Sequence, residues 1–205
     1  MAKVASDTKT GILKVALQLF LKKGYKDVSY SDLIAVSGLS KGAIYHHFKS
    51  KEELLASVFE YMIETGSKPV EISPEKEVKD FESFRKVFIK SKKLQFENFK
   101  KLLDTESVKF NKLLFFLEAI NENEKLKKLI MEILKQETFF LEKCFSGLKK
   151  HGKLPKGKDV ALLAESLFWM LQGTEMLIFF INSNVKEKDF MKMYDKTITD
   201  FFKII

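Results

Sequence analysis

The stretch Leu39–Lys51, with the sequence LSKGAIYHHFKSK, decides the fold of this 205-residue chain. Gly38, just before it, can take the left-handed backbone conformation that ends a helix. Ser40 is a favourable N-cap for the helix that follows. Within that short helix, Ile44 and Phe48 are four residues apart and can be buried on one face. The stretch therefore predicts a tight turn, a short helix and the start of another helix.

The opposite face of the short helix is polar and open. It carries Lys41, Gly42, Tyr45 and His46, which supply donors, an aromatic hydroxyl and a gap where a side chain would be. Such a surface suits the floor of a DNA major groove, where the edges of the bases are read. Tyr45 has a second interpretation, as a cover for the small core, although its hydroxyl must still reach a polar group.

The residues upstream complete a three-helix unit. The segment Ser29–Asp32 has the pattern of a capping box, and Leu33 with Val36 gives the apolar stripe of a short helix. Before it, apolar residues recur at helical spacing from Leu13 to Leu21, and Gly24 ends that helix. A helix, a turn and a basic helix in this order form a helix-turn-helix. The expected shared core is Leu13, Leu17, Phe20, Leu33, Val36, Ile44 and Phe48.

One set of residues in the first quarter of the chain forms a recognisable pattern. It comprises Ile12-Leu13 with Ala16 and Phe20, Gly24-Tyr25, Asp32-Leu33, Gly38 to Phe48, and Lys51-Glu52 with Leu54. With this set, and above all with its Ser-Lys-Gly-x-x-Tyr-x-His-Phe run, the chain resembles the TetR family of transcriptional regulators. A weaker likeness lies at 152–159, and between the two only helix number and length are similar. Lys9, Tyr30 and Ile34 depart from the residues usual in the family, which could change how the second helix packs or which bases are read.

Positive charge is concentrated in the same first quarter. The net charge of the chain is +8, and residues 1–51 contain nine lysines against three aspartates. Basicity on a helix-turn-helix is the electrostatic footprint of duplex DNA binding. The alternative is a chain that is simply lysine-rich for solubility.

Several other classes of protein fit poorly. The single cysteine, Cys144, excludes an internal disulfide and suits a reducing cytoplasm. The long apolar segment 160–181 contains Glu165 and Glu175, which are costly inside a bilayer. Adjacent His46 and His47 point about 100° apart on a helix, with no further ligand nearby. We therefore expect a cytoplasmic protein that is not an enzyme, has no signal peptide or membrane span, and needs no metal or cofactor.

The rest of the chain is predicted to be helical. One expected helix runs from Ser50 to a break at 66–69, and the next runs from Ser73 through Phe99 to a turn near 104–106. Further helices are expected from that turn to about Asn121, from Asn123 to Gly147 or beyond, from Asp159 to about Ser183 and from Lys188 to about Lys203. The fold class is all-α, with about nine helices. The resemblance implies a helix-turn-helix DNA-binding domain at 1–51 and a helical-bundle domain for effector binding and dimerisation at 52–205.

The expected sites follow this division. The residues expected to contact DNA are Ser29, Tyr30, Ser31, Ser40, Lys41, Gly42, Ala43, Tyr45, His46, His47 and Lys51. Twenty phenylalanines indicate either a phenylalanine-filled core or a cavity for an apolar ligand. For the cavity, the candidates are Phe99, Phe116, Phe140, Trp169, Gln172 and Met176, with Glu175 as a further polar group. For a dimer interface formed by the last two helices, the candidates are Leu163, Leu167, Met170, Leu171, Ile178, Met193, Thr197 and Phe201.

The function expected from these features is a ligand-responsive homodimeric repressor. Its partners would be a palindromic double-stranded DNA operator, a second copy of the chain and an unidentified small molecule, with no membrane. One alternative is a helix-turn-helix activator, or a regulator without an effector. Another, from a different class, is a basic helical lipid-binding carrier, which would need charge and apolar anchors but no glycine gap.

Overall fold

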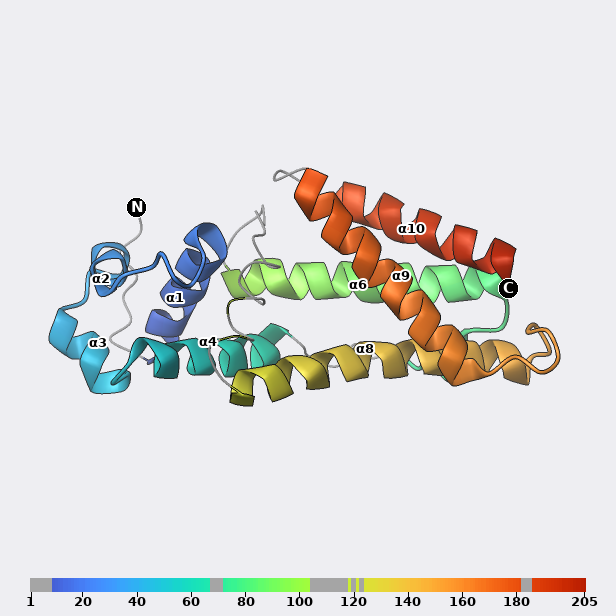
Figure 1. Ribbon diagram of the computed structural model, residues 1–205, viewed down its shortest axis with the longest axis horizontal. Helices are drawn as coiled ribbons and strands as arrows, with labels where there is room; N and C mark the ends of the chain where they lie inside the picture. Colours follow the sequence, from blue (N-terminus) through green and yellow to red (C-terminus); the bar gives the residue numbers. More distant parts are fainter. Residues whose placement is uncertain (1–8, 67–71, 104–117, 119–120, 122–123, 182–185) are drawn as a thin grey trace. The chain divides into compact units, whose positions relative to one another are not determined.

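The computed structural model describes residues 9–66, 72–103, 118, 121, 124–181 and 186–205. Within these ranges the chain forms nine helices and no strand, which confirms the all-α prediction (Figure 1). The helices are α1 (Lys9–Lys23), α2 (Tyr30–Ser37), α3 (Lys41–His47), α4 (Lys51–Gly66), α5 (Pro74–Glu77), α6 (Phe81–Leu103), α8 (Glu124–Lys150), α9 (Val160–Ile181) and α10 (Glu187–Ile204). The predicted turn near 104–106 and the cap at Asn123 lie outside the described residues.

The chain divides into two compact units. Unit 1 comprises residues 1–68 and 98–130, and unit 2 comprises residues 69–97 and 131–205. In unit 1, α1 packs against α2 and α4. Six of the seven residues predicted for its small core are buried: Leu13, Leu17, Phe20, Leu33, Ile44 and Phe48.

Val36 is the exception, because half of its surface is exposed. The buried face of α2 is formed by Leu33 and Ser37, which are four residues apart. Val36 lies three residues after Leu33 and is rotated to the side of that face. The prediction of Val36 as a core residue was therefore wrong.

Unit 2 is built on a core shared by α6, α8, α9 and α10. Its fully buried aromatic residues are Phe84, Phe88, Phe145, Phe168, Phe190, Tyr194 and Phe201. For these residues, the interpretation of phenylalanines as core is confirmed. The thiol of Cys144 is buried in the same cluster, and burial raises its pKa above the ordinary value.

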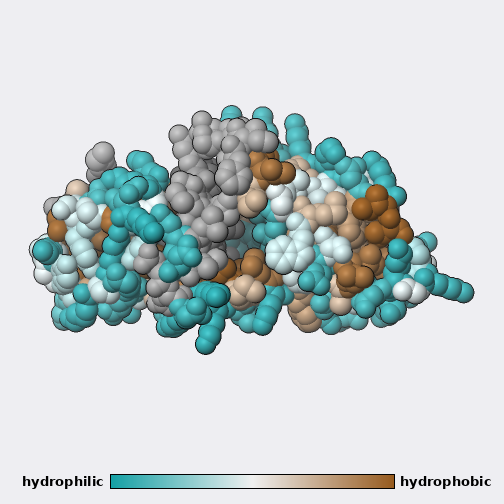
Figure 2. Space-filling view, viewed as in Figure 1, coloured by the Kyte–Doolittle hydropathy of each residue, from teal (hydrophilic) through white to brown (hydrophobic). Residues whose placement is uncertain are grey.

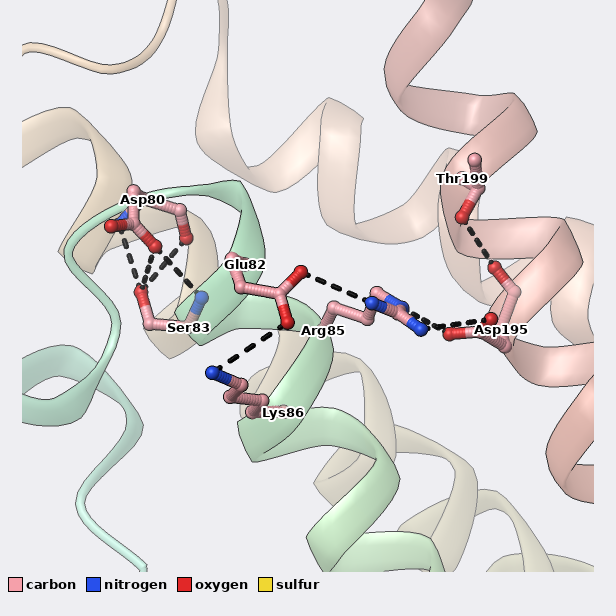
Figure 3. Close-up of polar contacts among 7 residues, drawn as sticks. All are labelled: Asp80, Glu82, Ser83, Arg85, Lys86, Asp195 and Thr199. Carbon is pink, nitrogen blue, oxygen red and sulfur yellow. Dashed lines mark hydrogen bonds and ion pairs between the residues drawn. The ribbon is translucent and has the colours of Figure 1, made fainter.

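One helix of unit 2 differs from the sequence prediction, and α8 agrees with it. The helix expected from Ser73 ends after one turn, at Glu77, and α6 begins anew after Asp80. The Ser83 backbone N–H donates to the Asp80 carboxylate (2.8 Å), and the Asp80 N–H donates to the Ser83 hydroxyl (2.8 Å), so that this reciprocal cap starts α6 (Figure 3). α8 continues past Gly147 to Lys150. Gly147 is needed because a Cβ there would lie 2.6 Å from the carbonyl oxygen of Val78.

The single arginine of the sequence, Arg85, connects α6 to α10. Its guanidinium forms a two-pronged ion pair with Asp195, with Nη2 to Oδ2 at 3.2 Å, and also pairs with Glu82 at 3.1 Å (Figure 3). These carboxylates raise the pKa of Arg85 above its already high value. A lysine cannot reproduce this planar fork.

α9 and α10 pack against each other and run antiparallel (Figure 1). One face of α9 enters the core, and the other face leaves large apolar side chains exposed: Leu162, Trp169, Met170, Met176 and Leu177. We call these five side chains the α9 apolar face. Among the described residues, no helix is both long enough and apolar enough to cross a bilayer.

Candidate nucleic-acid interface

Local hydrogen bonds set the turn between α2 and α3. The Ser29 hydroxyl accepts from the Asp32 N–H (3.2 Å) while the Asp32 carboxylate accepts from the Ser29 N–H (2.8 Å), as predicted for a capping box. Gly38 has a φ of +73° and closes α2, with its N–H donating to the Ile34 carbonyl (2.9 Å). Ser40 then caps α3 by accepting from the Ala43 N–H (3.2 Å). All three caps were visible in the sequence.

α3 presents two different faces. Ile44 and the following Phe48 are fully buried, whereas Lys41, Gly42 and His46 are exposed. Tyr45 is half-buried, and the Lys41 ammonium lies 5.5 Å from the centroid of its ring. The remaining expected contacts lie around this face: Ser29, Ser31 and Ser40 are exposed, and Ala43 and His47 are half-buried. The exposed face is therefore basic and aromatic, with a notch at its N-terminal end.

Gly42 has no role in the packing of the chain itself. A Cβ at this position would meet only the Ser40 hydroxyl oxygen, at an ordinary contact distance of 3.9 Å. Its φ lies outside the left-handed range that favours glycine, unlike that of Gly38. Folding alone thus does not require a glycine here, and its absent side chain leaves room for close approach to the backbone from outside.

Tyr30 makes a contact that its sequence position does not reveal. Its ring stacks on Tyr45, with centroids 4.5 Å apart and planes 17° from parallel. Its hydroxyl is buried, has no hydrogen-bond partner among the described residues, and has its pKa raised mainly by that burial. The stack joins the start of α2 to the exposed face of α3, so the Tyr30 ring holds the ring of Tyr45 in position.

The lysines around α3 have different roles. The Lys51 ammonium donates to the Lys26 carbonyl (3.1 Å) and lies 4.4 Å from the Tyr25 ring centroid, so it links the start of α4 to the segment after α1. Lys49 was not predicted as a site residue; its ammonium donates to the Tyr45 carbonyl (3.1 Å) at the C-terminal end of α3. A basic residue directly after a helix is the signal that could have found it.

The residues predicted to line a ligand cavity are scattered. Phe116 and the side chain of Phe99 lie outside the described residues. Phe140 is half-buried and packs against the core of unit 2, whereas Trp169 (60% exposed) and Met176 belong to the α9 apolar face. Gln172 donates from Nε2 to Glu137 (3.3 Å), and Glu175 accepts from the Tyr194 hydroxyl. The two polar candidates, Gln172 and Glu175, thus form hydrogen bonds to other side chains of unit 2.

The residues predicted for a dimer interface are mostly inward-facing. Leu163, Leu167, Leu171, Thr197 and Phe201 are buried within the chain's own fold, Ile178 and Met193 are half-buried, and Met170 is exposed. Exposed apolar surface instead belongs to the α9 apolar face and to Ile204. Figure 2 shows apolar side chains gathered over α9 and the C-terminal end of α10. A surface hollow of about 300 Å³ lies there, lined in part by Leu162, Met170 and Ile205.

The described residues contain no group of three or more His, Cys, Asp or Glu that could hold a metal ion. The arrangement is instead that of a helix-turn-helix protein: α2 and α3 form the motif, α1 and α4 support it, and a separate helical unit follows.

Comparison with known proteins identifies the kind of helix-turn-helix. The family profile "Bacterial regulatory proteins, tetR family" matches residues 12–58. The uncharacterised regulator YerO of Bacillus subtilis is 45% identical over 58 residues, which are 28% of this chain and 20% of that protein. AcrR of Shigella flexneri is 39% identical over 56 residues, 27% of this chain and 26% of that protein. TtgR of Pseudomonas putida is 25% identical over 177 residues, 82% of this chain and 79% of that protein.

The likeness extends to the whole fold. A TetR-family regulator from Agrobacterium tumefaciens has a solved structure that matches with a TM-score of 0.64 at 18% identity, covering 98% of this chain and 99% of that one. At this identity the likeness shows the fold alone. Residues 12–58 therefore place the helix-turn-helix of this chain in the tetR family of bacterial regulatory proteins, and the chain as a whole has the fold of solved regulators of that family.

Proposed function

We propose that the chain is a homodimeric repressor that binds a palindromic DNA operator through α3 and leaves it when a small molecule with a large apolar part binds unit 2. The observation that carries the DNA-binding part is Gly42. It is an exposed glycine with free space around it, placed between Lys41 and the Tyr45 ring on a basic face. An L-residue would fit there without strain, so the gap suits the close approach of a partner such as the DNA groove.

The contacts proposed for this face follow from its layout. Lys41, Gly42 and Ala43 begin α3 and would lie nearest the bases. The side chains of Tyr45, His46 and His47, with the exposed hydroxyls of Ser29, Ser31 and Ser40, would mostly contact phosphates, whereas the hydroxyl of Tyr30 is buried and would act only through Tyr45. Most such contacts fix the position of the protein, and few read sequence. Lys51 would act by its charge at the start of α4, where the helix dipole also favours an anion.

Dimerisation is proposed to use the α9 apolar face. Five large apolar side chains on one exposed helix face, next to an apolar hollow, form a patch of the kind that another protein surface covers. A two-fold axis through this face would pair α9 and α10 with their copies. Each dimer would then present two α3 helices, about 34 Å apart, to successive major grooves.

Release from the operator is proposed to follow a shift between two shapes of the protein. A ligand can shift this balance only by its difference in affinity for the two shapes. A difference of about 3 kcal/mol would weaken operator binding more than a hundredfold.

The test is to pass fragmented genomic DNA of the source organism over the immobilised full chain near physiological salt, and to sequence what is retained. We expect a few fragments that share an inverted repeat, and no such enrichment on a Gly42→Leu variant of equal helicity. Retention of all fragments without a common motif, equally by both proteins, would overturn the proposal and favour a basic helical carrier. Anionic vesicles then serve as the second probe, because membrane binding needs no gap at Gly42.

A further inference from the structure

A lysine lies in the middle of the aromatic core of unit 2. Lys92 is only 5% exposed, although it stands on α6 between two core-facing phenylalanines, four residues after Phe88 and four before Phe96. Its ammonium lies 5.4 Å from the Phe88 ring centroid and 5.2 Å from that of Tyr194 on α10. Ring faces stabilise a cation at this distance, most of all where water is excluded.

Glu137 of α8 supplies the negative charge. One of its carboxylate oxygens, Oε1, pairs with the Lys92 ammonium, and the other, Oε2, accepts from Gln172 Nε2 of α9 at 3.3 Å. Two donors from two helices thus converge on one carboxylate, and each oxygen has its own partner. This is the arrangement of a carboxylate-binding site, with a side chain of the protein itself as the occupant.

Stability does not explain such a cluster. Desolvating two charges costs about as much as their attraction returns, and well-packed apolar residues usually serve a core as well or better. A buried, paired charge surrounded by aromatic side chains is an arrangement that ligand-recognition sites use.

The two members of the pair are unequally held. The Lys92 side chain is 6% exposed, whereas the Glu137 side chain is 20% exposed. Glu137 can therefore turn towards water at lower cost than Lys92 can. The member that stays is the cation, and the member that can be exchanged is the carboxylate.

Aromatic side chains lie beside the charged pair. The Phe96 and Phe190 rings pack at 5.4 Å between centroids, and Phe190 lies 6.3 Å from Tyr194. Phe96 is half-buried, so this cluster of rings reaches from the ion pair towards the surface. A chain of methylene groups is the ligand part that such rings favour.

We propose that the Lys92–Gln172 pair of donors is the recognition site for an amphiphilic carboxylate, whose head group replaces Glu137 and whose apolar chain lies against the rings of α6 and α10. The site indicates the chemical class of the effector, and the regulatory role of that effector rests on the proposed function. Replacing Glu137 breaks the link from α8 to α6 and α9, which gives unit 2 two alternative arrangements. The ligand thereby favours the arrangement in which α8 is released.

The experiment measures binding of decanoate to the full chain by titration calorimetry, with decyltrimethylammonium and 1-decanol as probes of equal chain length. The wild type is compared with Lys92→Met and Glu137→Gln, and each variant is first checked for native helicity. We expect decanoate to bind the wild type, Lys92→Met to weaken binding at least about tenfold, and Glu137→Gln to tighten it, because the internal competitor is gone. A purely structural ion pair would make both variants change in the same direction.

Four results would overturn the inference. The first two are that decanoate does not bind the wild type, or that 1-decanol binds it as tightly as decanoate does. The others are that decyltrimethylammonium binds more tightly than decanoate and loses this binding in Glu137→Gln, or that both variants weaken decanoate binding equally. If Lys92→Met does not fold, Glu137→Gln and the three probes still decide. DNA binding is tested separately, with the operator fragments that the immobilised chain retains. Decanoate binding without sequence-specific DNA retention would refute the proposed function and keep the site, whereas specific DNA binding unaffected by bound decanoate would refute its role as effector.

Discussion

Replacing Gly42 by alanine separates DNA recognition from folding. The added Cβ meets only the Ser40 hydroxyl oxygen at 3.9 Å, so the protein itself does not resist it. Alanine is favoured over glycine in a helix by about 0.5–1 kcal/mol, and somewhat less is expected near the helix start. For a chain of this length, that gain corresponds to an unchanged Tm or a rise of about 1–4 °C.

The same methyl group stands where the DNA would approach. One good contact between a side chain and a base is worth about 1–3 kcal/mol, and about 1.4 kcal/mol is a factor of ten. We therefore expect Gly42→Ala to bind an operator duplex about 10–100-fold more weakly in a fluorescence anisotropy titration. Circular dichroism melting would show equal or greater thermal stability in the same preparation.

Gly38→Ala is the matched control. It also places a methyl group in open space, but at a φ of +73°, where the strain on an L-residue costs about 1–2 kcal/mol. This variant should melt earlier and yet, below its melting temperature, bind the operator nearly as tightly as the wild type. Wild-type operator affinity in Gly42→Ala would refute the reasoning, because α3 would then not approach DNA through Gly42.

Four further expectations concern other parts of the chain. Gly147→Ala should lower the free energy of unfolding by about 1–3 kcal/mol in urea titrations, because its Cβ would lie 2.6 Å from the backbone oxygen of Val78; unchanged stability would contradict that close approach. Tyr30→Leu should weaken operator binding with little change in Tm, since Tyr45 loses its stacking partner; equal affinity would leave Tyr30 with no positioning role. Leu177→Glu, on the α9 apolar face, should yield monomers in analytical ultracentrifugation, whereas an unchanged dimer would place the interface elsewhere. Hydrogen bonds from Lys23 and Ser29 lower the pKa of Asp32 in the folded state. The ionised carboxylate therefore stabilises the fold above its unfolded-state pKa, and this stabilisation is lost as the pH falls through the folded-state pKa. Asp32→Asn should flatten the acid limb of a curve of stability against pH.

The helix-turn-helix could be predicted because its determinants are local. Each cap involves residues three or four apart, as in the bond from the Asp32 N–H to the Ser29 hydroxyl or from the Ala43 N–H to Ser40. Gly38 ends α2 by its own backbone preference. Such features need no knowledge of the rest of the fold, so the sequence alone places them correctly.

The error at Val36 is local to α2, whereas the error at residues 73–80 arose where a distant segment contributes. Ser73-Pro74 does start a helix, but the chain leaves it at Val78, which is buried against α8. The packing of Val78 against a residue nearly seventy positions away cannot be read from the local sequence, although the Asp80–Ser83 cap that starts α6 is local. The helix through Gly147 was predicted to reach this residue or pass it, but its close contact with Val78 could not be predicted, because Val78 is distant in sequence.

The cluster of Lys92, Glu137 and Gln172 in unit 2 can be predicted from the sequence only in part, for the same reason. The stripe Phe88, Lys92 and Phe96 places a lysine at a core-facing position, and that much can be read from four-residue spacing. Its counter-ion cannot, because Glu137 is one of many glutamates on charged helices and is selected only when α8 packs beside α6. DNA-reading residues lie together in sequence because one short helix presents them, whereas a ligand site inside a bundle draws one residue from each helix. In unit 2 the charged side chain that the fold buries is Lys92, and for this reason we propose the effector site there.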